Sequence, residues 1–290
     1  MEELTLASPA KLNLSLDVLS RRSDGYHDLK MVMCSVELAD EVSVRLRGDG
    51  AVNVESNLPW LPRDRRNLAV KAAEAFFNAQ GEPFPGVDIR MVKRVPVGAG
   101  MAGGSGNAAA VLRALNTLTR AGMDAEALRS LGLEVGSDVP YCIAGGNALA
   151  EGRGERLTPL PAMPECSVVI CKPAFSVSTA ELFRRIDGRS LRTHPDTAGM
   201  TDAMAAGDLP AIARRMYNVF EDVLPRNCAE VHTVRSALLD AGALGAVMTG
   251  TGSAVFGLFE REETARKAYE TLKKSYRDCF LTRICSEPYF

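Results

Sequence analysis

The stretch Pro96-Val-Gly-Ala-Gly-Met-Ala-Gly-Gly-Ser-Gly-Asn-Ala-Ala109 carries the strongest structural signal in the sequence. Five of the nine residues from Gly98 to Gly106 are glycines, and a strong helix pattern follows them. Glycines let backbone N–H groups approach a ligand closely, and a helix start adds unpaired N–H donors and partial positive charge. The stretch therefore predicts a phosphate-binding loop. The alternative is a flexible turn between a strand and a helix.

The spacing of the glycines narrows the type of loop. Gly98, Gly100 and Gly103 form a GxGxxG pattern, but a Rossmann fold also needs a following strand that ends in an acidic residue. Here the helix is followed at Gly122-Met-Asp124 by the start of another helix. No GK[ST] closes the motif, which excludes a Walker A loop. The sequence thus favours a nucleotide loop of a third kind.

Strands and helices are interleaved outward from this loop along the whole chain. We expect strands at about 12–18, 29–46 (interrupted at 39–40), 87–97, 168–171, 243–249, 254–259 and 279–285. We expect helices at about 67–79, from the loop to 120, and at 124–133, 178–186, 198–206, 209–224, 228–241 and 261–276. Prolines at 159, 161 and 164 indicate a boundary, so we predict an α+β protein with domains at 1–157 and 158–290.

Composition excludes several classes of protein. Hydrophobic residues make up 46% and charged residues 24%, and the net charge of −2 gives no case for nucleic-acid or membrane-surface partners. Seven scattered cysteines without a CxxC spacing indicate reduced, mostly buried thiols. Three histidines at unrelated positions argue against a histidine-built metal site or a Ser-His-Asp hydrolase. Without a signal peptide or an apolar membrane span, a cytoplasmic protein is expected.

Three segments together resemble the motifs of the GHMP kinases. Residues 96–109 are similar to the second motif, P-x-G-x-G-L-G-x-S-S/G-A/S-A. Pro9-Ala-Lys-Leu-Asn-Leu14 resembles the first motif, and Val247-Met-Thr-Gly-Thr-Gly-Ser-Ala254 resembles the third. The resemblance implies a ribosomal-S5-like N-terminal domain, a ferredoxin-like C-terminal domain and an active site between them. It also implies ATP and Mg²⁺ as cofactors.

Within that superfamily, three more segments are similar to the 4-diphosphocytidyl-2-C-methyl-D-erythritol kinases. They are Asp24-Gly-Tyr-His27, Gly136-Ser-Asp-Val-Pro140 and Glu151-Gly-Arg-Gly-Glu155. This implies that the substrate is a small cytidyl compound, which is phosphorylated on its 2-hydroxyl in non-mevalonate isoprenoid synthesis. We expect the protein to be a monomer or a weak homodimer. The alternatives are a homoserine or mevalonate type of GHMP kinase, and a non-enzymatic nucleotide- or RNA-binding protein. The net charge argues against the last of these.

The resemblance also implies roles for individual residues. Asp138 is the candidate base, against the alternative of turn capping, and Lys11 would hold its carboxylate ionised and orient the hydroxyl. Asn13 would contact the substrate diol. The cytidyl moiety would bind among Tyr26, His27, Thr179 and Phe183, although Phe183 alone would favour a core position.

The nucleotide would be held by the loop and by two flanking residues. The loop residues are Pro96, Val97, Gly98, Ala99, Gly100, Met101, Ala102, Gly103, Gly104, Ser105 and Gly106. Asn67 and Lys93 would approach the adenine and phosphates; the alternatives are a helix cap and a solvated strand residue. Ala102 and Gly106 replace the glycine and serine common in the family. With one hydroxyl fewer at 106, Ser105 and backbone amides must hold phosphate and Mg²⁺.

Overall fold

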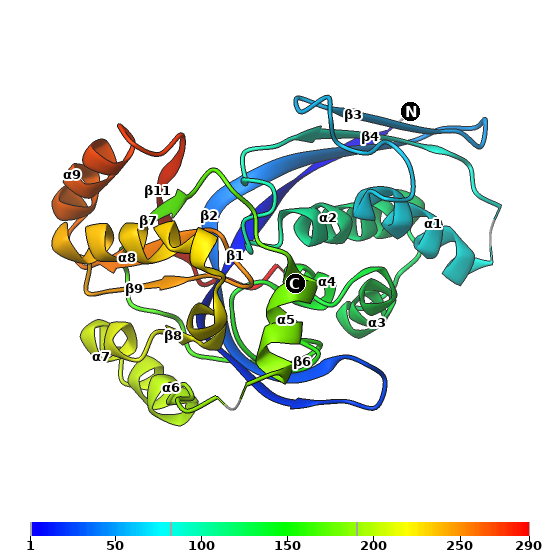
Figure 1. Ribbon diagram of the computed structural model, residues 1–290. Helices are drawn as coiled ribbons and strands as arrows, with labels where there is room; N and C mark the ends of the chain where they lie inside the picture. The colour runs from blue at the N-terminus through cyan, green and yellow to red at the C-terminus, as the bar shows by residue number, and fades with distance from the viewer. Residues whose placement is uncertain (1, 82, 190, 290) are drawn as a thin grey trace.

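A computed structural model describes residues 2–81, 83–189 and 191–289 of the chain. A long antiparallel hairpin, β1 (Glu3–Arg21) and β2 (His27–Leu46), runs through the middle of the molecule (Figure 1). The predicted strand at 12–18 is therefore the centre of a longer one. The pairing register shifts between Asn13 and Ser15, and a one-residue shift moves side chains to the opposite face of a sheet. Consequently, the hairpin serves two cores.

The hairpin joins two groups of strands into one sheet of 11 strands. The strands of the first group are β3 (Val52–Ser56), β4 (Val87–Val92), β5 (Asn147–Gly152) and β6 (Arg156–Pro159). The strands of the second are β7 (Ser167–Lys172), β9 (Gly245–Met248), β10 (Val255–Phe259) and β11 (Asp278–Cys285). Their main order is β3-β4-β2-β11-β7-β10-β9. The groups meet where Ile284 and Cys285 of β11 pair with Val36 and Ser35 of β2.

The helices of the N-terminal half pack on one face of the first group. They are α1 (Leu68–Gln80), α2 (Gly103–Thr119), α3 (Ala125–Val135) and α4 (Val139–Ala144), and they lie together in Figure 1. Helix α2 carries buried alanines at 108, 109, 110 and 114. Small side chains allow α2 to lie close to the hairpin, which fixes the position of its N-terminus. This core also contains Phe76, Leu16 and Val18.

The C-terminal half contributes a second set of helices. They are α5 (Thr179–Asp187), α6 (Thr197–Ala205), α7 (Leu209–Arg214), α8 (Glu230–Asp240) and α9 (Glu262–Leu272), with 3₁₀ turns η1 (Val219–Val223) and η2 (Arg226–Cys228). A second core places Leu12 and Leu14 of the hairpin against Met200 and Ile212 of α6 and α7. The interleaved strands and helices confirm the α+β class.

One predicted helix, 209–224, is wrong. Helix α7 ends at Arg214, and the short strand β8 (Tyr217–Asn218) then pairs in parallel with β1. Buried Asn218 explains the break, because its Nδ2 donates to the carbonyl oxygens of Met248 and Gly250 at 2.7 and 2.8 Å. These tertiary hydrogen bonds outweigh the weak local helix preference.

Two other expectations have clear outcomes. The predicted strand 87–97 stops at Val92, because Asp40 accepts hydrogen bonds from the backbone N–H groups of Arg94 and Val95. All seven cysteines are free thiols and six of them are buried, as predicted. In the described part of the chain, no helix has both the length and the apolar character needed to cross a membrane.

Candidate active site

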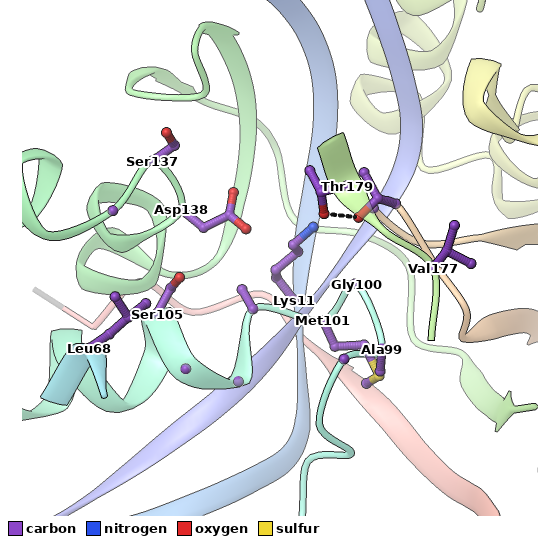
Figure 2. A pocket seen from close by; sticks show the side chains of 18 of the residues that line it. Lys11, Leu68, Ala99, Gly100, Met101, Ser105, Ser137, Asp138, Val177 and Thr179 are labelled. Carbon is purple, nitrogen blue, oxygen red and sulfur yellow. Dashed lines mark hydrogen bonds between the residues drawn. The ribbon is translucent and has the colours of Figure 1, made fainter. Parts of the chain in front are cut away.

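A cavity of about 1070 Å³ is lined by residues of all three motifs: the lysine of residues 9–14 and glycines of residues 96–109 and 247–254. Figure 2 shows Lys11 from β1, the Ala99–Met101 loop, Ser105 at the start of α2, Asp138 before α4 and Thr179 of α5 around it. The volume is at the upper end of the range for single small-molecule sites, so two ligands can bind side by side.

The loop at 98–106 has the geometry expected of an anion site. Helix α2 begins at Gly103, and its N-cap residue, Ala102, makes no side-chain capping hydrogen bond. The first N–H groups of a helix have no intrahelical acceptor, and here they belong to residues on the cavity wall. Gly98 and Gly100 have φ values of 66° and 75°, a conformation that favours glycine. A flexible turn does not explain this arrangement.

The second and third motifs are packed backbone against backbone. A Cβ at Gly100 would overlap the carbonyl oxygen of Thr249, and one at Gly250 would lie 2.7 Å from the carbonyl oxygen of Gly100. The Ala254 N–H also donates to the Ala99 carbonyl at 3.2 Å. Residues 250–252 line the cavity beside the phosphate loop. Only glycines allow the two loops to lie this close together.

Asp138 and Lys11 point toward one another across the cavity (Figure 2). Asp138 is the N-cap residue of α4, but its side chain makes no capping hydrogen bond. Within the described residues its carboxylate has no hydrogen-bond or ion-pair partner, so turn capping does not account for it. Lys11 is only 4% exposed. A free carboxylate beside a buried ammonium can accept a proton from a hydroxyl bound between them.

Asn13 is completely buried and lies beneath Lys11 rather than on the cavity wall. Its Oδ1 accepts hydrogen bonds from Lys11 Nζ at 2.5 Å and from the Gly250 N–H at 2.9 Å. Its backbone N–H donates to Thr249 Oγ1 at 3.1 Å. The structure thus gives Asn13 a position that joins the first and third motifs, and its contact with substrate stays a prediction.

Lys93 lines the cavity, but its ammonium group is bound by buried side chains beneath the phosphate loop. It is ion-paired with fully buried Asp40 and donates to Asn107 Oδ1 at 2.8 Å. Asn107 Nδ2 donates in turn to Asp40 Oδ2 at 2.9 Å. Burial lowers the pKa of Lys93 even though Asp40 acts in the opposite direction. We name Asp40, Lys93 and Asn107 the buried triad; it fixes the first turn of α2.

The sequence analysis missed Asp40 and Asn107. Their signal was weak: Asp40 lies at the expected interruption of the strand 29–46, which the structure shows unbroken as β2, and Asn107 precedes a run of alanines. Asn67, by contrast, caps α1, which is the alternative role that the sequence indicated for it. Its Oδ1 accepts from the Ala69 N–H at 3.1 Å, while its residue also lines the cavity.

Aromatic rings also line this cavity, and we refer to the part that they form as the aromatic or acceptor end. Phe183 stacks on His27 with centroids 4.5 Å apart and an interplanar angle of 21°, and it meets Phe220 edge to face at 5.0 Å. His27 Nε2 is 2.7 Å from Asp187 Oδ1. Tyr26 is 49% exposed. The structure therefore brings together two residues, His27 and Phe183, that come from different halves of the chain.

Thr179 lies between the aromatic end and the third motif. Its Oγ1 forms a hydrogen bond of 2.8 Å with Thr251 Oγ1, which Figure 2 draws as a dashed line. The contact links α5 to the glycine loop at 250–252. Asp187 and Phe220, which support the aromatic residues, had no signal in the sequence, since each is one of many similar residues in an amphipathic segment.

The two departures from the family pattern have different structural consequences. Ala102 adopts φ 55° and ψ 26°, a left-handed conformation that is unfavourable for alanine. Gly106 faces β1 rather than the cavity, and a Cβ there would lie 2.6 Å from Ser8 Oγ. A serine at 106 could not reach the phosphate site in this chain. The expected loss of a phosphate ligand at 106 is therefore wrong.

Comparisons with known proteins agree with this geometry. The family described as "GHMP kinases N terminal domain" matches residues 67–146, and "GHMP kinases C terminal" matches residues 200–278. A protein of Alkaliphilus metalliredigens named 4-diphosphocytidyl-2-C-methyl-D-erythritol kinase is 42% identical over 286 residues, or 99% of this chain and 98% of its own. One of Acetivibrio thermocellus with the same name is 41% identical, over 98% of this chain and 99% of its own.

A solved structure gives the same result. The crystal structure of a 4-(cytidine 5'-diphospho)-2C-methyl-D-erythritol kinase superposes with a TM-score of 0.80 at 34% identity, covering 98% of this chain and 100% of that one. The fold, the three converging motifs and these full-length similarities lead to one conclusion. This chain belongs to the GHMP kinase family.

Proposed function

We propose that this chain transfers the terminal phosphoryl group of ATP to the 2-hydroxyl of 4-diphosphocytidyl-2-C-methyl-D-erythritol. The observation that carries the proposal is that Lys11 and Asp138 point toward one another in a cavity lined by both the glycine-built anion site and the aromatic residues. Relatives of about 40% identity over the whole chain bear the name of this activity. The predicted domain 1–157 would supply the phosphate-binding loop, and the predicted domain 158–290 would supply Phe183 at the aromatic end.

Some of these residues would position the two substrates, and others would take part in proton transfer. Backbone N–H groups of the 98–106 loop and the start of α2 would bind the phosphates of ATP. Asp138 would accept the proton of the substrate hydroxyl as its oxygen forms the new bond to phosphorus and ADP leaves. Lys11, held by Asn13, would orient the hydroxyl and stabilise negative charge on the transferred group. The buried triad keeps the amide donors in place.

The donor atoms present are compatible with Mg²⁺ bound mainly through phosphate. Among the described residues, no group of three or more histidine, cysteine, aspartate or glutamate side chains could hold a metal ion. Mg²⁺ commonly binds through substrate phosphates, water and one or two protein groups. Ser105 lines the cavity and would provide one such group. The ion would neutralise phosphate charge there.

A substrate panel tests the proposal. Purified protein with ATP and MgCl₂ would be assayed for ADP release with the cytidyl substrate, mevalonate and homoserine. We expect turnover with the cytidyl substrate and at least about 100-fold lower kcat/KM with the others, because neither offers a ring to the aromatic end. Equal or higher activity with mevalonate or homoserine would overturn the assignment. Retention of RNA without any turnover would favour a binding protein.

A further inference from the structure

Arg153 connects the two parts of the acceptor end of the cavity. It lies in the turn between β5 and β6, and its guanidinium carbon is 3.7 Å from the centroid of the Tyr26 ring. Its Nη2 is 3.5 Å from Ser137 Oγ, on the residue that precedes Asp138. All of these residues line the cavity. Arg153 therefore spans the wall from the aromatic residues to the candidate base.

Arg153 has no direct ion-pair partner in the described part of the chain, although the charge of Asp24 acts on it from a longer distance. Within residues 2–81, 83–189 and 191–289, no carboxylate oxygen lies within 4.0 Å of its guanidinium nitrogens. Its Nε is buried and, in that same part of the chain, has no hydrogen-bond acceptor. The neighbouring carboxylate of Glu155 instead accepts from the backbone N–H of Arg153 at 2.6 Å. Arg21, also at this end, is paired with Asp187.

A buried N–H on a cation without an acceptor is unfavourable, so this site is prepared for an anionic ligand. Guanidinium groups bind phosphate through two parallel hydrogen bonds, and stacking on Tyr26 would hold the planar group in one orientation. Ser137 and Tyr26 contact the guanidinium group without pairing with its charge, and Asp24 is itself paired with Arg22. The chemistry of the wall thus points to a phosphate-containing ligand at Arg153.

We propose that Arg153 binds the diphosphate group of the cytidyl substrate and is therefore a determinant of specificity. The proposal rests on the proposed function. In that substrate a diphosphate joins the cytidine to the sugar alcohol. With the base at Tyr26 and Phe183 and the hydroxyl at Asp138, the diphosphate passes the wall that Arg153 occupies.

The test compares cytidine 5′-diphosphate with cytidine by calorimetry, with the nucleotide end saturated by ADP. Arg153→Met should weaken binding of cytidine 5′-diphosphate about 10- to 100-fold, the range of a bidentate charged hydrogen bond, and change cytidine binding less than about threefold. Arg153→Lys, which keeps the charge but not the planar fork, should fall between the two. The matched control is Arg156→Met, an exposed arginine on β6, which should bind both ligands like the wild type.

Each outcome decides the proposal. An equal loss of cytidine and cytidine 5′-diphosphate would mean that Arg153 only holds Tyr26, and would overturn it. Unchanged binding of cytidine 5′-diphosphate would overturn it as well. In both cases the wild type would still phosphorylate the cytidyl substrate, so the proposed function would stand. A wild type that neither binds these ligands nor phosphorylates that substrate would refute both. Should Arg153→Met fail to fold, Arg153→Lys gives the same comparison.

Discussion

The two ends of the cavity are built in different ways. The nucleotide end consists of backbone: the glycines of two loops and the first turn of α2, fixed from beneath by the buried triad. The acceptor end consists of side chains from distant elements, namely His27, Phe183 and Arg153. A backbone site is sensitive to added atoms at glycine positions. A side-chain site is sensitive to the loss of single groups.

The largest effect is expected where the two ends meet. Asp138→Asn keeps the size of the side chain but removes the proton acceptor. We expect kcat to fall by about 10²- to 10⁴-fold, the usual contribution of a positioned base, with the Kd for ATP and the Tm unchanged. Steady-state kinetics and calorimetry measure both quantities. Turnover within about threefold of the wild type would remove Asp138 from the reaction.

The second test concerns the support of the nucleotide end. Asp40→Ala leaves the Lys93 ammonium buried without its partner, and a broken buried pair lowers stability by about 3–5 kcal/mol. Urea unfolding monitored by circular dichroism measures the free energy of unfolding. The double variant Asp40→Ala, Lys93→Met should recover a large part of the loss because it removes the uncompensated charge. Independent, additive losses would show that the two residues do not act as a pair.

Sequence reasoning predicted the loop and helix start of the backbone end, and there is a physical reason for that. Glycine spacing, the helix that follows and the order of three motifs are local features, and local features specify a loop that binds through its own N–H groups. Asp138 was selected through the family resemblance of a short turn, and its role as the base stays a prediction. These predictions needed no knowledge of which distant residues meet.

The acceptor end and the supports of the loop were harder to predict. His27 and Phe183 stack only because α5 folds back against the start of β2, which no local pattern encodes. The helix predicted at 209–224 fails for the same reason, since Asn218 is bound by carbonyl groups of the third motif. Long-range contacts decide these features, and periodicity does not report them.

The third test removes one ring from the acceptor end. Phe183→Ala should raise the KM for the cytidyl substrate about 10- to 100-fold, since stacking on a base contributes about 1–3 kcal/mol. The KM for ATP should stay nearly constant, because the nucleotide binds at the glycine loops. Steady-state kinetics with each substrate varied in turn separates the two constants.

A control addresses the packing role of the same ring, which meets Phe220 edge to face. Phe220→Leu disturbs that contact while leaving Phe183 in place, so any effect of packing alone should be visible in its Tm. A matched rise of both KM values in Phe183→Ala, together with a Tm loss like that of Phe220→Leu, would return Phe183 to the core.

The fourth test adds atoms at the backbone end. Gly106→Ser should destabilise the fold by about 1–3 kcal/mol, because the new Cβ would meet Ser8 Oγ and overpacking has this magnitude. Denaturant unfolding gives the value. Combining it with Ser8→Ala removes the clashing hydroxyl, so the double variant should lose less than Gly106→Ser alone. A stable Gly106→Ser that binds ATP more tightly would contradict the inward position of residue 106.

The smallest effect concerns Ala102, whose positive φ is the unfavourable feature of the phosphate loop. The left-handed conformation costs alanine about 1–2 kcal/mol, and glycine loses about 0.5–1 kcal/mol more backbone entropy on folding. The difference leaves Ala102→Gly more stable by roughly 0.5 kcal/mol, a Tm increase of about 1–2 °C. Ala99→Gly is the matched control: Ala99 is buried and has no positive φ, so losing its methyl group should lower the Tm. Calorimetric melting of both variants checks the sign. If Ala102→Gly lowered the Tm, the left-handed conformation would not be the native one, and the amide donors of α2 would point elsewhere.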